Sequence, residues 1–332
     1  MALEIRSPTS ASVPALVRRA TGSEYLILWL SLAYAAAMGP FVPGFLTGQN
    51  LVNVLVSLLP LFIACLGQML VLMVRGIDLS VTSIIALASI VGAMAANTTT
   101  GWLAGHPLAA PAAVLLMLGV GSAVGMLNGA AIAWLRMPAF IVTLTGMTFF
   151  SGLAVWLTQS KNISGLPAAF VLIGGNPWIA LAVAALVGGV MHVLLARSLW
   201  GRWIVAVGYN PKAAHISGVP VAGVTIAAYS LSGLLAALAS VLYTGQAETG
   251  SPVLGQRLLL DIIAATILGG TSLNGGRGKV LWTLCGVLFL KLVDNSLNLL
   301  SLSIFTITMV KGALILLAAL LDRTRSRREG GA

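Results

Sequence analysis

Long apolar runs alternate with short polar connections along the chain. These runs cover 25–42, 50–74, 81–96, 108–135, 139–157, 178–196, 221–243, 258–269, 280–300 and 304–321. A helix that crosses a bilayer needs roughly 20 apolar residues, so the pattern predicts an all-α, polytopic membrane protein with about ten transmembrane helices. The runs are rich in Gly, Ala and Ser, which favour close packing of helices in lipid.

Polar segments at the two ends bound the predicted membrane part. We expect residues 1–24 to form a cytoplasmic N-terminal tail, 25–321 the transmembrane domain, and 322–332 a basic cytoplasmic C-terminal tail. The N-terminal segment lacks the short apolar core and the small-residue cleavage site of a secretory signal. The first span is therefore expected to remain in place as an anchor.

Composition and charge support a membrane location. Of the 332 residues, 58% are hydrophobic and 8% are charged, whereas soluble domains carry about 25% charged residues. The formal net charge of +10 would indicate a nucleic-acid partner in a soluble protein. Here 14 of the 18 Lys and Arg residues fall on the side of the tails. Lys161 and Arg257 fall on the other side, and Lys291 and Lys311 lie within spans. Because basic residues favour cytoplasmic loops, we expect both tails in the cytoplasm and no nucleic-acid partner.

The longest polar interruption covers residues 201–220 and separates two apolar runs. Asn210, with a proline directly after it, is a helix-start signal, and Gly218 is a helix-stop signal. Between them, Ala213 and Ala214 would give a small, flat surface on one or two helical turns. A helix this short is marginal alone, so we expect it to dock onto another protein. An ordinary helical loop is the alternative.

A glycine-rich run at 269–279 invites a nucleotide-binding interpretation, which its spacing excludes. The phosphate-loop pattern G-x-x-x-x-G-K-[ST] would need a glycine at Leu273 and a serine or threonine at Val280. The run predicts a tight turn instead. The three histidines lie in separate segments, and the two cysteines lie inside apolar runs. We therefore expect a chain that is not an enzyme and binds no metal or cofactor.

Ionisable residues within the predicted spans are few. They are Asp261, Lys291, Asp294 and Lys311, and such groups usually face the bundle interior or a cavity. Asp294 follows Lys291 by three residues, so the two share a helix face and are able to pair. A proton-coupled carrier would use such residues as a relay. A structural ion pair, or a Lys311 side chain that extends to the membrane interface, is at least as compatible with the sequence.

Asp78 lies in the polar connection between the second and third runs and has two interpretations. It caps the next helix, because Asp and Ser favour first turns, or it gates the mouth of a pathway. Polar residues such as Asn128 and Asn298 would hydrogen-bond a sugar or simply join helices. The candidate gating or pathway residues are Asp78, Asn128, Asp261, Asp294 and Asn298.

Several ordered blocks resemble the ribose-type sugar permease family of ABC importers. They are GIDLSVTS at 76–83, NGAAIAWLRMPAFIVTLTGM at 128–147, GRWIVAVGYNPKAAHISGV at 201–219 and LDIIAATILGGTSLNGGRGKV at 260–280. Lys212-Ala213-Ala214-x-x-x-Gly218 also resembles the E-A-A-x-x-x-G element of ABC importer permeases, with lysine in place of glutamate. Members of the family often have two glycines before the Ile-Asp pair, where this chain has Arg75 and Gly76.

The resemblance implies a membrane subunit of a larger assembly in the lipid bilayer of a bacterial inner membrane. Its partners would be a second permease subunit in a homodimer or heterodimer, cytoplasmic ABC ATPase subunits and a periplasmic sugar-binding protein. ATP and Mg²⁺ would be used by the partner ATPase. The loop 197–220 would be the coupling loop that enters the ATPase. Its implied coupling residues are Arg202, Asn210, Lys212, Ala213, Ala214 and Gly218.

The function that the resemblance implies is translocation of a monosaccharide or a similar small polyol. Two alternatives remain open at this point. One is a branched-chain amino acid permease of the same superfamily, and the other is an ion-coupled secondary transporter that uses Asp261 or the Lys291–Asp294 pair.

Overall fold

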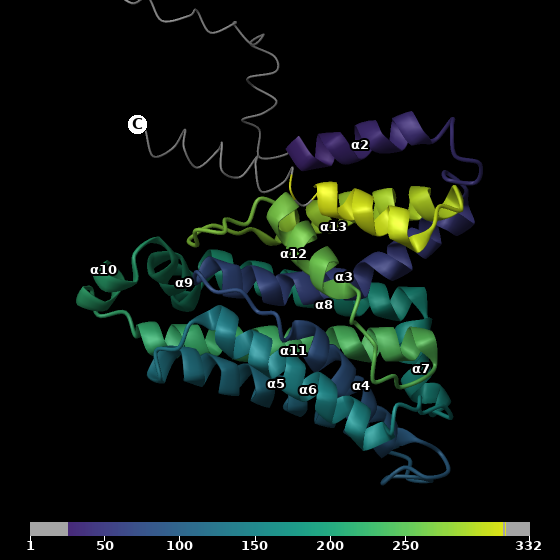
Figure 1. Ribbon diagram of the computed structural model, residues 1–332, viewed down its shortest axis with the longest axis horizontal. Coiled ribbons are helices and arrows are strands. Elements are labelled where there is room, and N and C mark those ends of the chain that lie inside the picture. The colour runs from purple at the N-terminus through teal and green to yellow at the C-terminus, as the bar shows by residue number, and fades with distance from the viewer. Residues whose placement is uncertain (1–25, 315, 317–332) are drawn as a thin grey trace, which may run out of the picture.

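The computed structural model describes residues 26–314 and 316, and these residues form a bundle of helices (Figure 1). The helices are α2 (Leu26–Met38), α3 (Gly48–Met73), α4 (Val81–Ala96), α5 (Ala109–Trp134), α6 (Ala139–Thr158), α7 (Ala168–Gly175), α8 (Pro177–Arg197), α9 (Leu199–Tyr209), α10 (Pro211–Ile216), α11 (Val221–Ala247), α12 (Leu258–Leu268), α13 (Val280–Leu299) and a last helix, Ile304–Leu314. Within the described residues the β-type pairing is an isolated bridge between Ile163 and Gly250. The all-α prediction is confirmed.

Each predicted apolar run contains a helix, but these helices fall into two length classes. Six are long and apolar enough to cross a membrane, namely α3, α5, α6, α8, α11 and α13. Four apolar helices are shorter, namely Ile27–Met38, Val81–Ala96, Leu258–Leu268 and Ile304–Leu314. The protein is therefore a polytopic helical membrane protein with 6 candidate spans by length and composition. The predicted tails at 1–24 and 322–332 lie outside the described residues.

Two predicted polar connections contain helices that the sequence pattern did not indicate. The connection at 158–177 holds α7, and the loop at 197–220 holds α9 as well as α10. The side chain of Ser198 caps the start of α9 by accepting a hydrogen bond from a backbone N–H three residues on, at 3.0 Å. Ile204 and Val207 of α9 are buried. Helix α9 therefore has an apolar face that packs onto the bundle, which the polar character of this loop did not indicate.

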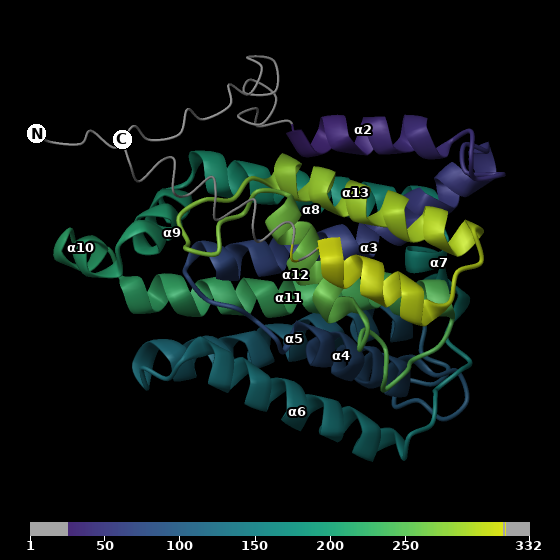
Figure 2. The same cartoon turned by 45° about the horizontal axis from the view of Figure 1, so that its top comes forward.

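Helix α3 is the centre of the bundle. In its most apolar 18-residue window 83% of the residues are buried, against 11% for α6. It packs against α8, α11, α12 and α13, and α11 in turn packs along α5. In Figures 1 and 2, α5 and α6 lie on one side of α11 and α2 lies on the opposite side of the bundle. Both views place α9 and α10 at one end of the bundle and α7 at the other, so α10 projects beyond the ends of the long helices.

Candidate functional site

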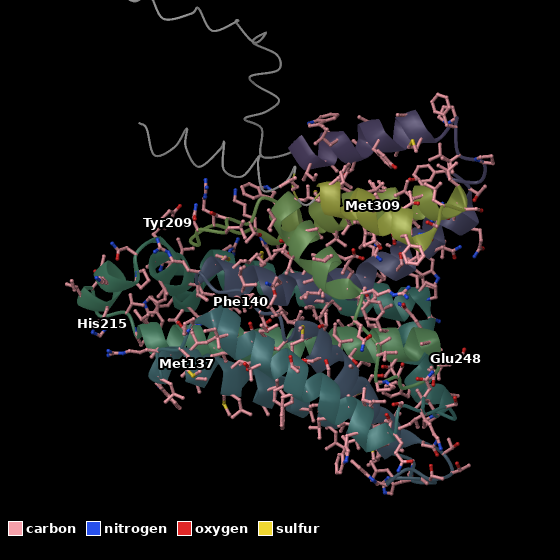
Figure 3. The ribbon with its side chains drawn as sticks, viewed as in Figure 1. Met137, Phe140, Tyr209, His215, Glu248 and Met309 are labelled. Carbon is pink, nitrogen blue, oxygen red and sulfur yellow. The ribbon has the colours of Figure 1, made fainter. Side chains whose placement is uncertain are left out.

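The short helix α10 forms where the sequence predicts it. Asn210 is its N-cap, with φ −157°, and its Oδ1 accepts hydrogen bonds from the N–H groups of Lys212 and Ala213 at 3.0 and 3.1 Å. A proline occupies the first helical position. Gly218 follows the helix with φ +82°, a left-handed conformation that suits glycine. Cap and stop residues therefore define a rigid turn that projects from the bundle, with His215 labelled on it in Figure 3.

The exposed surface of α10 differs from the predicted one. Ala213 is exposed, but Ala214 is 5% exposed and belongs to the main hydrophobic core, so the expected flat alanine surface is wrong for Ala214. Ile216 is 86% exposed, more than any other large apolar side chain among the described residues. Sequence reasoning missed Ile216, although its spacing of three residues from Ala213 places both on one helix face. The protruding face of α10 therefore presents Ala213 and Ile216.

The other predicted coupling residues lie at different distances from this face. Lys212 and Gly218 are exposed beside it. Arg202 is exposed too, but it belongs to α9 and precedes Asn210 by eight residues. At a helical rise of 1.5 Å per residue that separation is about 12 Å. The structure therefore does not bring Arg202 to the protruding face of α10.

Asp78 and Asn128 meet in one buried hydrogen-bond network. Asp78 is fully buried, and its Oδ1 accepts hydrogen bonds from the Ser80 backbone N–H at 2.9 Å and from Ser80 Oγ at 2.6 Å. The Ser80 hydroxyl oxygen in turn accepts a hydrogen bond from Asn128 Nδ2 at 2.8 Å. Ser232 Oγ donates a longer bond of 3.3 Å to Asp78 Oδ2. Ser80 is the N-cap residue of α4 and makes no side-chain cap bond, so Asp78 holds the residue before the helix rather than capping the helix itself.

Asp261 and Asp294 also come together, and a lysine joins them. Lys311 Nζ lies 3.0 Å from Asp261 Oδ2 and 2.9 Å from Asp294 Oδ1. The predicted pair is looser, because Lys291 Nζ is 4.0 Å from Asp294 Oδ2. We call Asp261, Lys291, Asp294 and Lys311 the charge cluster; it connects α12, α13 and the last helix. Pairing across that helix was not foreseen, because Lys311 and Asp261 are 50 residues apart.

The side-chain amide of Asn298 does not bond the charge cluster's side chains. Its Nδ2 donates to the backbone carbonyl of Asp294 at 2.6 Å, and the bond is exposed. This contact lies within one turn of α13 and gives no sign of a ligand site.

An apolar groove lies elsewhere on the bundle. It has a volume of about 340 Å³ and lies between α3, α8 and α13. Its walls include Phe62, Gly188, His192 and Leu284. Its lining is mostly apolar and includes none of the candidate pathway residues, so the groove does not fit a polar sugar.

Comparison with known proteins identifies the family. Residues 50–319 match the family model described as "Branched-chain amino acid transport system / permease component". The chain is 39% identical to "Ribose import permease protein RbsC" of Bacillus subtilis (strain 168), over 86% of this chain and 88% of that protein. It is 35% identical to the protein of the same name from Escherichia coli (strain K12), over 89% and 92% of the two chains.

Arabinose permeases are also similar. The chain is 31% identical to "L-arabinose ABC transporter permease protein AraH" of Azospirillum brasilense, over 96% of this chain and 94% of that protein. No solved structure matches significantly. All three relatives are named as permease proteins, which agrees with the expectation of a transport component rather than an enzyme. The chain therefore belongs to the family of ABC-transporter permease components that includes these ribose and L-arabinose permeases.

Proposed function

We propose that this chain forms the translocation pathway of an ATP-driven importer for a monosaccharide or a similar small polyol. A periplasmic binding protein delivers the sugar, and separate cytoplasmic ATPase subunits hydrolyse ATP with Mg²⁺. The chain works beside a second permease subunit in a bacterial inner membrane, with ten spans and both tails in the cytoplasm, and itself binds no cofactor. Relatives named for ribose and L-arabinose support the substrate class.

The observation that carries this proposal is the protruding helix α10. It is capped, it rests on the bundle through Ala214, and its protruding face exposes Ile216 to 86%. An apolar side chain with that exposure gains from burial in a partner, at roughly 25 cal/mol per Å² of apolar surface removed from water. Docking there passes motion of the ATPase dimer to α9 and α11, which flank α10 in the chain. The spans then alternate between outward-facing and inward-facing states. Each partner shifts this equilibrium toward the state that it binds more tightly.

An Ile216→Glu variant is expected to lose ATPase binding while the chain still folds. The exposed side chain supports no internal packing, whereas a charge in a desolvated docking groove is strongly unfavourable. A docking anchor contributes about 2 kcal/mol or more, so copurification of the ATPase with the permease should fall at least tenfold. Uptake of radiolabelled ribose or L-arabinose into proteoliposomes that contain ATP should fall with it.

Val253→Glu is the matched control, because Val253 is also an exposed β-branched residue, 53% accessible, but follows α11 at the opposite end. It should leave ATPase copurification unchanged. Ala214 is a poorer target, since its burial means that a bulky residue there also disturbs the loop. Normal assembly and uptake with Ile216→Glu would refute docking through α10.

Two other functions are tested by the same uptake assay. The description of the matched family model favours branched-chain amino acids as a second substrate class. ATP-dependent uptake of radiolabelled leucine, together with no uptake of ribose or arabinose, would support it. An ion-coupled carrier is favoured by the charge cluster alone; it predicts uptake driven by a proton gradient without ATP and abolished in Asp294→Asn.

A further inference from the structure

The corner between α9 and α10 breaks two helical hydrogen bonds. In a continuous helix the N–H groups of Lys212 and Ala213 would bond the carbonyls of Gly208 and Tyr209, four residues back. Here both N–H groups instead bond Asn210 Oδ1, at 3.0 and 3.1 Å. The carbonyls of Gly208 and Tyr209 are therefore released at the end of α9, where they need other donors.

Arg75, from the connection between α3 and α4, supplies both donors. Its Nε donates to the Gly208 carbonyl at 2.6 Å and its Nη2 donates to the Tyr209 carbonyl at 2.6 Å. A planar guanidinium presents two parallel N–H groups, and a positive charge is favourable at a helix C-terminus. Asn210 thus replaces the lost acceptors of the broken bonds, and Arg75 replaces their lost donors. Tyr209 marks this corner in Figure 3.

The backbone at Arg75 is held in an unusual conformation. Its φ is +65°, in the left-handed region that non-glycine residues avoid. Two contacts fix this position: the Gly276 N–H donates to the Met73 carbonyl at 2.9 Å, and Gly275 lies so close that a Cβ there would be 2.6 Å from Arg75 Cγ. The surrounding segments thus hold Arg75 in a conformation that aims its side chain at α9.

The other end of the same connection enters the bundle. Three residues after Arg75, Asp78 is fully buried and bonds Ser80, which also accepts from Asn128 of α5. Thr143 Oγ1 of α6 donates to the Ile77 carbonyl at 3.1 Å. The connection at 75–80 therefore joins the α9–α10 corner to helices α4, α5 and α6 by hydrogen bonds, and its Ile77 also packs against Leu72 and Ile267.

We propose that Arg75 is a positioning residue that fixes the α9–α10 corner and passes displacement of α10 through residues 75–80 to the buried Asp78–Ser80–Asn128 network. This inference rests on the proposed function, because it requires that an ATPase moves α10. Arg75 does not contact the ATPase or the sugar in this scheme. It adds a polar link to the apolar contacts that α9 and α10 already make with the bundle.

The test is an Arg75→Met variant in the complete transporter, reconstituted with its ATPase and binding protein in proteoliposomes. Met removes the two donors but keeps the length of an unbranched side chain. ATPase copurification should stay within twofold of the unsubstituted protein, because the exposed face of α10 is unchanged. The number of radiolabelled ribose or arabinose molecules moved per ATP hydrolysed should fall about tenfold. Arg75→Lys keeps the charge without the planar fork and should show a fall of about threefold.

Arg136→Met is the matched control. Arg136 also has a left-handed backbone, with φ +55°, and is exposed, with no side-chain hydrogen bond or ion pair among the described residues. Figure 3 places its neighbour Met137 at the same end of the bundle as α10. The variant should transport as the unsubstituted protein does. An equal fall in Arg136→Met and Arg75→Met would overturn the proposal, since general loss of basic charge would then explain both.

A double-mutant cycle with Asn210→Ala tests whether the two side chains secure one corner. Residues that act on the same structural unit give non-additive effects, so the double variant should be little worse than the more damaging single one. Additive losses, an unchanged transport-to-ATP ratio in Arg75→Met, or loss of ATPase copurification in Arg75→Met would each overturn the positioning role. If the unsubstituted chain itself binds no ATPase, the proposed function fails and not merely this inference.

Discussion

A Lys311→Met variant is expected to be less stable than the unsubstituted protein by about 3–5 kcal/mol, the usual effect of breaking a buried ion pair by removing one partner. Lys311 Nζ is within 3.0 Å of Asp261 and 2.9 Å of Asp294, and its side chain is 15% exposed. Without it, the one lysine or arginine that the described residues still place within 4.0 Å of these two largely buried carboxylates is Lys291, at 4.0 Å from Asp294. Unfolding of the purified protein in dodecyl maltoside micelles titrated with SDS, followed by circular dichroism, measures the loss.

A second substitution distinguishes lost charge balance from lost packing. Asp261→Asn combined with Lys311→Met leaves one aspartate and one lysine in the charge cluster, so it should recover at least half of the lost stability. Lys161→Met removes an exposed lysine and should change stability by no more than about 0.5 kcal/mol. If the double variant is as unstable as Lys311→Met, packing of the lysine stem rather than charge explains the loss.

A Gly121→Ala variant is expected to be less stable by about 2–3 kcal/mol, because it forces α5 and α11 apart. A Cβ on Gly121 would overlap the carbonyl oxygen of Gly233, and a Cβ on Gly233 would overlap the carbonyl oxygen of Gly121. Both obstacles are backbone atoms, so no flexible side chain is able to move aside. Overpacking of this kind typically costs 1–3 kcal/mol, and close approach through small residues is what holds helices together in lipid.

Gly119→Ala is the control, two residues away on α5. Nothing lies within 4 Å of the position its Cβ would take. Alanine there should leave stability unchanged or raise it by up to about 1 kcal/mol, because alanine is the better helix former. The same SDS titration should therefore show a loss of stability for Gly121→Ala and no change or a gain of stability for Gly119→Ala. Equal effects would mean that the α5–α11 contact does not depend on close backbone approach.

The sequence was most informative about features that local residues determine. The apolar runs predict where the described membrane helices lie, because burial in lipid requires apolar residues over a whole helix. Asn210 with its following proline, and Gly218, predict α10 because caps and stops act through backbone groups only a few residues away. The resemblance in four ordered blocks predicts the family, which the comparisons confirm.

Tertiary structure decided which residues face one another. It placed Ala214 in the core and Ile216 outside, because packing onto the bundle selects which face of α10 is buried. It brought Lys311 between Asp261 and Asp294 and brought Arg75 to the end of α9, over separations of 50 and 133 residues. Such contacts leave no periodic signal in one sequence, because they depend on how separate helices pack. The sequence by itself therefore determined the helices of the apolar runs and the short helix α10. Only the packing of the helices determined the charge cluster and the link between α10 and the bundle interior.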